Sequence, residues 1–102
     1  PSDFLSQALA PRSDSLTISN GHGIYLQYCI ECHSINGVGG GAATDHVARD
    51  RPIARDTLRF FLFEFAKRYS EARMPDFSGL LDQQDVTDLQ RYLEHMFVVH
   101  DE

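Results

Sequence analysis

The stretch G21-H-G-I-Y25-L-Q-Y-C29-I-E-C32-H33 decides how this chain folds. Gly21, Tyr25 and Cys29 recur every four positions, which places them along one face of a helix. Cys32 follows Cys29 at a spacing of three residues, so both thiols lie on the same side of that helix, with His33 next to the second thiol. The pattern predicts a helix that presents two thiols and an imidazole together.

The string C29-I-E-C32-H33 has the form C-x-x-C-H, which is the attachment signature of a c-type haem. Two thiols at this spacing can reach the two haem vinyl positions while the imidazole of His33 comes under the iron. A disulfide, a zinc site and a thioredoxin-like redox pair stay open as alternatives. Zinc needs further ligands and the chain has no third cysteine. A thioredoxin-like pair needs a preceding strand, whereas the residues before Cys29 follow a helical pattern.

Haem iron in an electron carrier has two axial ligands, and the sequence predicts Met74 as the second. A thioether is a soft, neutral ligand that stabilises ferrous iron. Met74 precedes Pro75, which disfavours helical backbone at Met74 and predicts a loop or helix end there. Met96 lies on an apolar helical stripe and is predicted to pack in the core. The competing imidazole ligands are His22, His46, His95 and His100.

The rest of the chain predicts helices and loops. The predicted segments are an extended arm over 1–18, a first helix over 21–32 capped by Ser19 or Asn20, a glycine-rich loop over 34–44, a second helix over 56–72 capped by Asp56, and a third helix from Asp82 to about His100. No alternating strand pattern, hairpin signal or internal repeat is found. We therefore expect an all-α fold, with one domain over 19–102 behind the arm.

Over about residues 19–100 the chain resembles the class I c-type cytochromes. The motif C29-I-E-C32-H33 near the start, M74-P75-D76-F77 late in the chain and the closing helix carry this resemblance. It implies a small cytochrome c fold, with three main helices around one covalently attached haem c. Gly21, Tyr25 and Tyr92 match positions where the first and last helices of that family cross.

The chain departs from the family pattern at two places. The family usually has a proline after the glycine loop, near a backbone carbonyl that accepts the N–H of the proximal imidazole; Thr44 stands there in this chain. Which carbonyl serves is left open. Tryptophan is absent, so no indole can bind a haem propionate. The candidates for that contact, or simply for a solvated basic stretch, are Arg49, Arg51, Arg55 and Arg59.

Length and charge narrow the function. A chain of 102 residues fits one domain, and its net charge of −6 makes nucleic acid a poor partner. It has no apolar run of about 18 residues and no recognisable signal peptide. The resemblance implies export, so we expect a periplasmic protein.

The leading hypothesis is a one-electron carrier and not an enzyme, either a free shuttle between redox proteins or the cytochrome subunit of a dehydrogenase or oxidase. Its docking surface is expected at the haem edge near Cys29, Cys32 and residues 73–77. The alternatives are a haem enzyme or gas sensor with an open sixth iron site, and a haem-free thiol or zinc protein.

Overall fold

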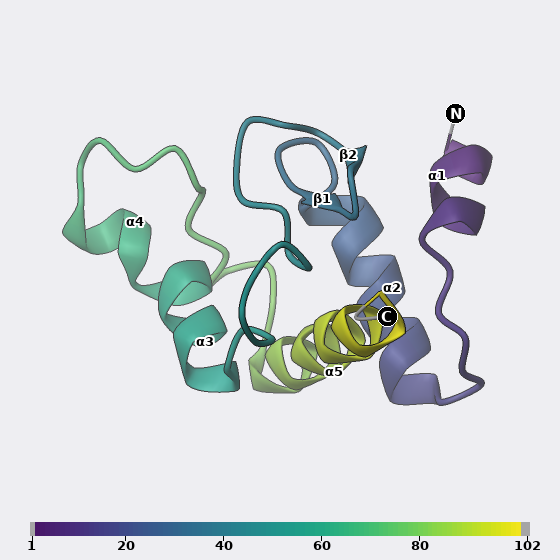
Figure 1. Ribbon diagram of the computed structural model, residues 1–102. Coiled ribbons are helices and arrows are strands. Elements are labelled where there is room, and N and C mark those ends of the chain that lie inside the picture. Colours follow the sequence, from purple (N-terminus) through teal and green to yellow (C-terminus); the bar gives the residue numbers. More distant parts are fainter. Residues whose placement is uncertain (1, 101–102) are drawn as a thin grey trace.

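The computed structural model describes residues 2–100. Pro1, the first residue of the predicted arm, and residues 101–102, the last two of the predicted domain, lie outside the described residues. The chain is mostly helical, as expected (Figure 1). Its elements are α1 (Ser2–Ala8), α2 (Leu16–Tyr28), β1 (Ser34–Ile35), β2 (Val38–Gly39), α3 (Arg55–Phe63), α4 (Phe65–Arg68) and α5 (Gln83–Val99).

The centre of the core is the crossing of α2 and α5 (Figure 1). Gly21 is buried there, and a Cβ at this position would meet the carbonyl oxygen of Asp88 and lie 2.6 Å from Cβ of Tyr92. Tyr25 and Tyr92 are both fully buried, with ring centroids 5.8 Å apart. The missing side chain at Gly21 lets the two helices approach closely, and the tyrosine rings fill the space beside the contact.

The closing helix has the predicted boundaries because its first turn is capped twice. The Asp82 side chain accepts a hydrogen bond from the backbone N–H of Asp85 at 2.9 Å, and the Asp85 side chain accepts one from the N–H of Asp82 at 3.0 Å. This reciprocal pair satisfies two N–H groups that a helix start leaves free. His100 ends the helix as its C-cap.

The helix α2, which is the first helix that the sequence predicts, begins earlier than predicted, at Leu16 and not at Gly21. Ser15 is its N-cap and accepts a hydrogen bond from the N–H of Ile18 at 3.4 Å. Ser15 supplies the same capping hydroxyl as Ser19, and no proline or glycine lies between them to stop the helix at the later cap.

The predicted helix over 56–72 is also different, because it breaks at Glu64 into α3 and α4. Asp56 does not cap it; the N-cap is Ala54, which makes no side-chain hydrogen bond. After the break Phe65 packs against Phe61, with ring centroids 5.0 Å apart. The break at Glu64 thus leaves two half-buried aromatic rings in contact.

The prediction of a fold without strands is wrong in one detail. β1 and β2 pair antiparallel, with Ile35 opposite Val38, around a turn made by Asn36 and Gly37. Their φ angles of 51° and 83° are both left-handed. Asn-Gly is the preferred pair for such a type I′ turn, but strands of two residues are too short to show an alternating pattern.

The N-terminal segment is not the extended arm that the sequence predicts. Residues 2–8 are helical, and Leu9 is only 1 % exposed within the core. The Tyr92 hydroxyl donates a hydrogen bond to the carbonyl of Leu9 at 2.7 Å, and the N–H of Arg12 donates to Nε2 of His95 at 2.9 Å. The segment therefore packs on its own domain. The apolar residues of this segment follow no sustained helical period, so the sequence pattern does not indicate the short helix.

Candidate functional site

The two cysteines lie just after the end of α2, whereas the sequence predicts a helix that continues through both of them to Cys32. Cys29 is the C-cap of α2, with its N–H bonded to the carbonyl of Tyr25. The Cys29 carbonyl then accepts hydrogen bonds from the N–H groups of Cys32 at 3.2 Å and His33 at 2.9 Å. This turn keeps both thiols and the imidazole at the same end of the helix.

The thiols are free, one buried and one exposed. Cys29 is buried and Cys32 is exposed, and no disulfide joins them. Burial, with a further contribution from the Cys32 thiol, raises the pKa of Cys29 to about 12. The first cysteine of a thioredoxin-like pair needs a lowered pKa to act as a thiolate. The environment of Cys29 therefore disfavours the redox-pair alternative.

The imidazole of His33 is oriented by the backbone of the loop opposite. Its Nδ1 lies 2.8 Å from the carbonyl oxygen of Thr44. Because a carbonyl can only accept, the proton is on Nδ1 and the lone pair of the neutral ring is on Nε2. Metal-binding histidines usually donate their other ring N–H to a carbonyl or carboxylate in this way. Thr44, at the place of the family's proline region, supplies the carbonyl that the sequence left open.

Asp45 fixes the loop that carries this carbonyl. Its carboxylate accepts hydrogen bonds from the hydroxyl of Ser34 at 2.8 Å and from the N–H groups of Asn36, Gly37 and Val47 at 3.1, 2.8 and 3.0 Å. Burial raises the pKa of Asp45, but these hydrogen bonds outweigh it and lower the pKa to about 2. The Asp45 side chain thus holds the β1–β2 turn and the Thr44 loop together by hydrogen bonds. Asp45 is not among the site residues that the sequence predicts.

A cavity of about 230 Å³ lies beside His33. Its walls are formed by His33, Ala43, Thr44, His46, Arg49, Ile53, Leu58, Phe61, Phe65 and Met74. The cavity thus brings together His33 and Met74, the two predicted axial ligands, on a largely apolar surface. Its lining fits a flat apolar group that binds a metal at its centre.

Met74 is held at the cavity by a loop that is anchored to α3. It sits in a bend and is partly buried against the core, as its position before Pro75 predicts. The following segment is fixed where the N–H of Phe77 donates to the carbonyl of Leu62 at 2.8 Å. Met96, by contrast, is 2 % exposed within the core face of α5, as predicted.

Of the competing histidines, only His46 lines the cavity. It is buried, and its ring stacks on His33 with centroids 4.4 Å apart and planes 30° apart. Two imidazoles on opposite faces of one haem would have the iron and the porphyrin between them, so rings in contact cannot be such a pair. Burial, then the nearby His33 and Arg49, lowers the pKa of His46 to about 4.

The other three histidines do not line the cavity. His22 packs against Tyr92 with ring centroids 5.4 Å apart, and His95 accepts the hydrogen bond from Arg12. His100 is exposed at the end of α5.

The four candidate arginines differ in their positions. Arg49 lines the cavity. Arg55 and Arg59 both donate to the side-chain oxygen of Gln83, at 3.1 and 3.3 Å. Arg51 is exposed. Arg49 is therefore the best placed of the four to bind an anionic group at the cavity.

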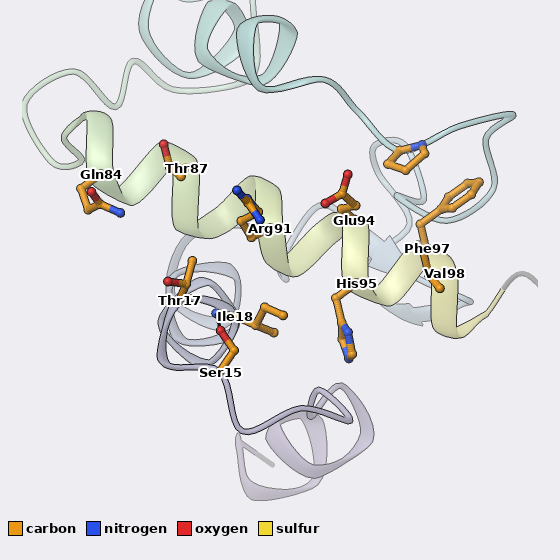
Figure 2. A pocket seen from close by; sticks show the side chains of 11 residues that line it. Ser15, Thr17, Ile18, Gln84, Thr87, Arg91, Glu94, His95, Phe97 and Val98 are labelled. Atoms are coloured by element: carbon orange, nitrogen blue, oxygen red, sulfur yellow. Dashed lines mark hydrogen bonds between the residues drawn. The ribbon is translucent and has the colours of Figure 1, made fainter.

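A second hollow, of about 620 Å³, lies between the start of α2 and the outer side of α5 (Figure 2). Ile18, Arg91 and His95 are among its lining residues, and His95 points from α5 toward the N-terminal segment. None of the predicted haem-binding residues lines this second hollow.

In the part of the chain that the structure describes, no helix is both long enough and apolar enough to span a membrane. A protein-family model described as cytochrome c oxidase, cbb3-type, subunit III matches residues 17–93. No curated protein and no solved structure matches the chain.

Proposed function

The chain belongs to the cbb3-type cytochrome c oxidase subunit III family, a class I c-type cytochrome family, and we propose that it transfers single electrons through one haem held by Cys29, Cys32, His33 and Met74. Family membership makes covalently bound haem c, with its iron, the cofactor of this chain. When bound, the haem supplies an iron that alternates between the ferric and ferrous states.

One observation supports the choice of His33 and Met74 as iron ligands. Nδ1 of His33 donates a hydrogen bond to the carbonyl of Thr44, at a cavity that Met74 also lines. The bond leaves Nε2 with its lone pair, as a metal ligand requires. We assign His33 as the proximal ligand for this reason.

Cys29 and Cys32 are assigned as the thioether-forming residues. The turn after α2 holds them next to His33, with Cys29 against the core and Cys32 at the surface. Covalent attachment at both positions would leave one edge of the cofactor near the exposed Cys32. A short path from solvent to the cofactor favours electron transfer to a docked protein.

Met74 is assigned as the distal ligand. Its loop is held by the Phe77–Leu62 hydrogen bond, so the thioether is kept at the cavity without belonging to a helix. A neutral sulfur ligand favours ferrous iron and raises the reduction potential. With Met74 as a ligand, the iron would have no open position, which suits a carrier that binds no substrate.

The partner is proposed to be a redox protein of the periplasm, with this chain as a free carrier or as a subunit of an oxidase or dehydrogenase. The family description supports an oxidase complex. Residues 49–73, which include Arg49, Phe61 and Phe65 of the cavity wall, contain seven basic and four acidic side chains, although the whole chain has a net charge of −6. A partner that docks at this segment would be steered by acidic groups.

An absorption spectrum of the purified holoprotein tests the proposal. Sharp reduced α and β bands, together with the weak red band that ferric haem shows with a sulfur ligand, are expected. Haem bands without the sulfur band would contradict Met74 and point to an open sixth site, which rapid binding of carbon monoxide would reveal. Protein matured in a host that attaches haem c, yet without haem bands, would contradict the whole assignment.

A further inference from the structure

We infer that His46 is a positioning residue for His33, and that its ring, held in turn by Tyr25, sets the plane of the proximal imidazole. This inference deepens the proposed function and rests on His33 being the proximal ligand. It assigns a role to a buried histidine that the ligand set itself does not use.

The contact between the two rings is face to face. Their centroids are 4.4 Å apart and their planes differ by 30°. The hydrogen bond from His33 to Thr44 fixes where Nδ1 points, but carbonyl oxygens accept hydrogen bonds over a broad range of directions. That bond therefore leaves the tilt of the His33 ring loosely determined. A second ring packed on its face restricts the tilt, since rotation would bring the ring edge into His46.

His46 can restrict its neighbour because it is itself fixed. Its backbone N–H donates to the carbonyl of Ser34 at 2.9 Å, and its side chain is buried. Nδ1 of His46 lies 3.4 Å from the hydroxyl of Tyr25, and the two rings meet edge to face with centroids 5.5 Å apart. Tyr25 is fully buried at the α2–α5 crossing. A continuous set of contacts thus links the buried α2–α5 crossing to the His33 ring.

The orientation of an axial imidazole is measurable in a haem protein. The plane of the ring determines how its orbitals overlap with those of the iron, which affects the anisotropy of ferric haem and contributes to the reduction potential. If His46 sets this plane, removing the ring at position 46 will alter both quantities. Restoring an aromatic ring without the imidazole nitrogens will recover the anisotropy of the ferric haem.

The experiment compares H46L and H46F as holoproteins, with H100A as the control because His100 is exposed at the end of α5. Leucine and phenylalanine both keep the site filled and apolar, and only phenylalanine keeps a flat face against His33. Proton NMR of the haem methyl groups in the ferric state and the reduction potential are measured for each. We expect H46L to change the methyl shift pattern and the potential, and H46F and H100A to resemble the wild type in the methyl pattern.

A further variant, Y25F, removes only the hydroxyl next to His46. It is expected to change the methyl pattern in the same sense as H46L but by less, because the edge-to-face contact remains. The inference is overturned if H46L leaves the pattern unchanged, or if H46F changes it as much as H46L does, since polarity and not ring contact would then be responsible. Failure of the proposed function is distinguishable: the wild-type protein itself would then lack the spectrum of a His33-ligated haem.

Discussion

Nδ1 of His33 and the carbonyl oxygen of Thr44 are 2.8 Å apart, and this hydrogen bond joins the end of α2 to the loop that follows the β1–β2 turn. The loop keeps its position because Asp45, the next residue, accepts hydrogen bonds from the backbone on both sides. Asp45 thus supports the candidate axial ligand without touching it.

Substitution of Asp45 by asparagine should therefore destabilise the protein in a pH-dependent way. The folded-state pKa of about 2 lies below the ordinary value near 3.9, so the carboxylate stabilises the fold above about pH 4 and this contribution is lost as the pH falls toward 2. After a discount for the partial exposure of this carboxylate, we expect D45N to lose about 1–2 kcal/mol at pH 7. Urea unfolding of the holoprotein at a series of pH values measures this.

The control for this experiment is D56N, because Asp56 is exposed at the start of α3 and makes only a long contact, 3.8 Å, with Arg55. Its stability should follow that of the wild type at every pH. A constant difference between D45N and the wild type from pH 7 to pH 2 would show that the charge of Asp45 is not what holds the loop.

The sequence predicts the parts of the fold that depend on local signals. α5 has the predicted ends because Asp82 and Asp85 cap it within one turn. The start of α2 is predicted five residues too late, at Gly21 and not at Leu16, because Ser15 and Ser19 offer the same capping chemistry. The N-terminal segment is held by a contact between distant parts of the chain, which no local pattern contains: Leu9 is buried, and its carbonyl accepts a hydrogen bond from Tyr92.

The residues of the candidate site also fall into two groups, those that a local sequence pattern identifies and those that it does not. Cys29, Cys32 and His33 are recognisable from spacing, and Met74 from the proline that follows it, so the sequence suffices to propose them. Asp45 and His46 carry no such pattern. An aspartate after a glycine-rich loop hints at a turn-stabilising role, which was the one available signal for Asp45. The stacking of His46 on His33 depends on how the loop folds back.

Met74 and Met96 provide a matched test of the distal ligand. M74L should abolish the weak red band of the ferric protein and lower the reduction potential, because it removes the only thioether at the cavity wall among the described residues. M96L, a nearly isosteric change in the core, should keep both properties and cost less than about 1.5 kcal/mol of stability. Visible spectra and redox titration of the two variants decide the point. Retention of the red band in M74L would contradict the assignment.

Gly21 and Gly23 allow the helix crossing to be tested within a single helix. A Cβ at Gly21 would collide with the Asp88 carbonyl and approach Tyr92, so G21A must push α2 and α5 apart and should cost about 3 kcal/mol. At Gly23 an added Cβ meets nothing within 4 Å, and G23A should stabilise the helix by about 0.5–1 kcal/mol. Thermal unfolding of both holoproteins measures the difference. Equal stabilities would mean that the helices do not cross at Gly21.

The packing of the N-terminal segment is tested by two leucines that differ mainly in burial. Leu9 is 1 % exposed and its carbonyl accepts the hydrogen bond from Tyr92, whereas Leu16 is 86 % exposed. L9A should therefore cost about 2–5 kcal/mol, while L16A should stay within about 0.5 kcal/mol of the wild type. Release of the segment should also make residues 10–15 more sensitive to limited proteolysis in L9A alone. If L9A and L16A behave alike in both measurements, the segment does not pack on the core in solution, and its apolar residues become available to a partner instead.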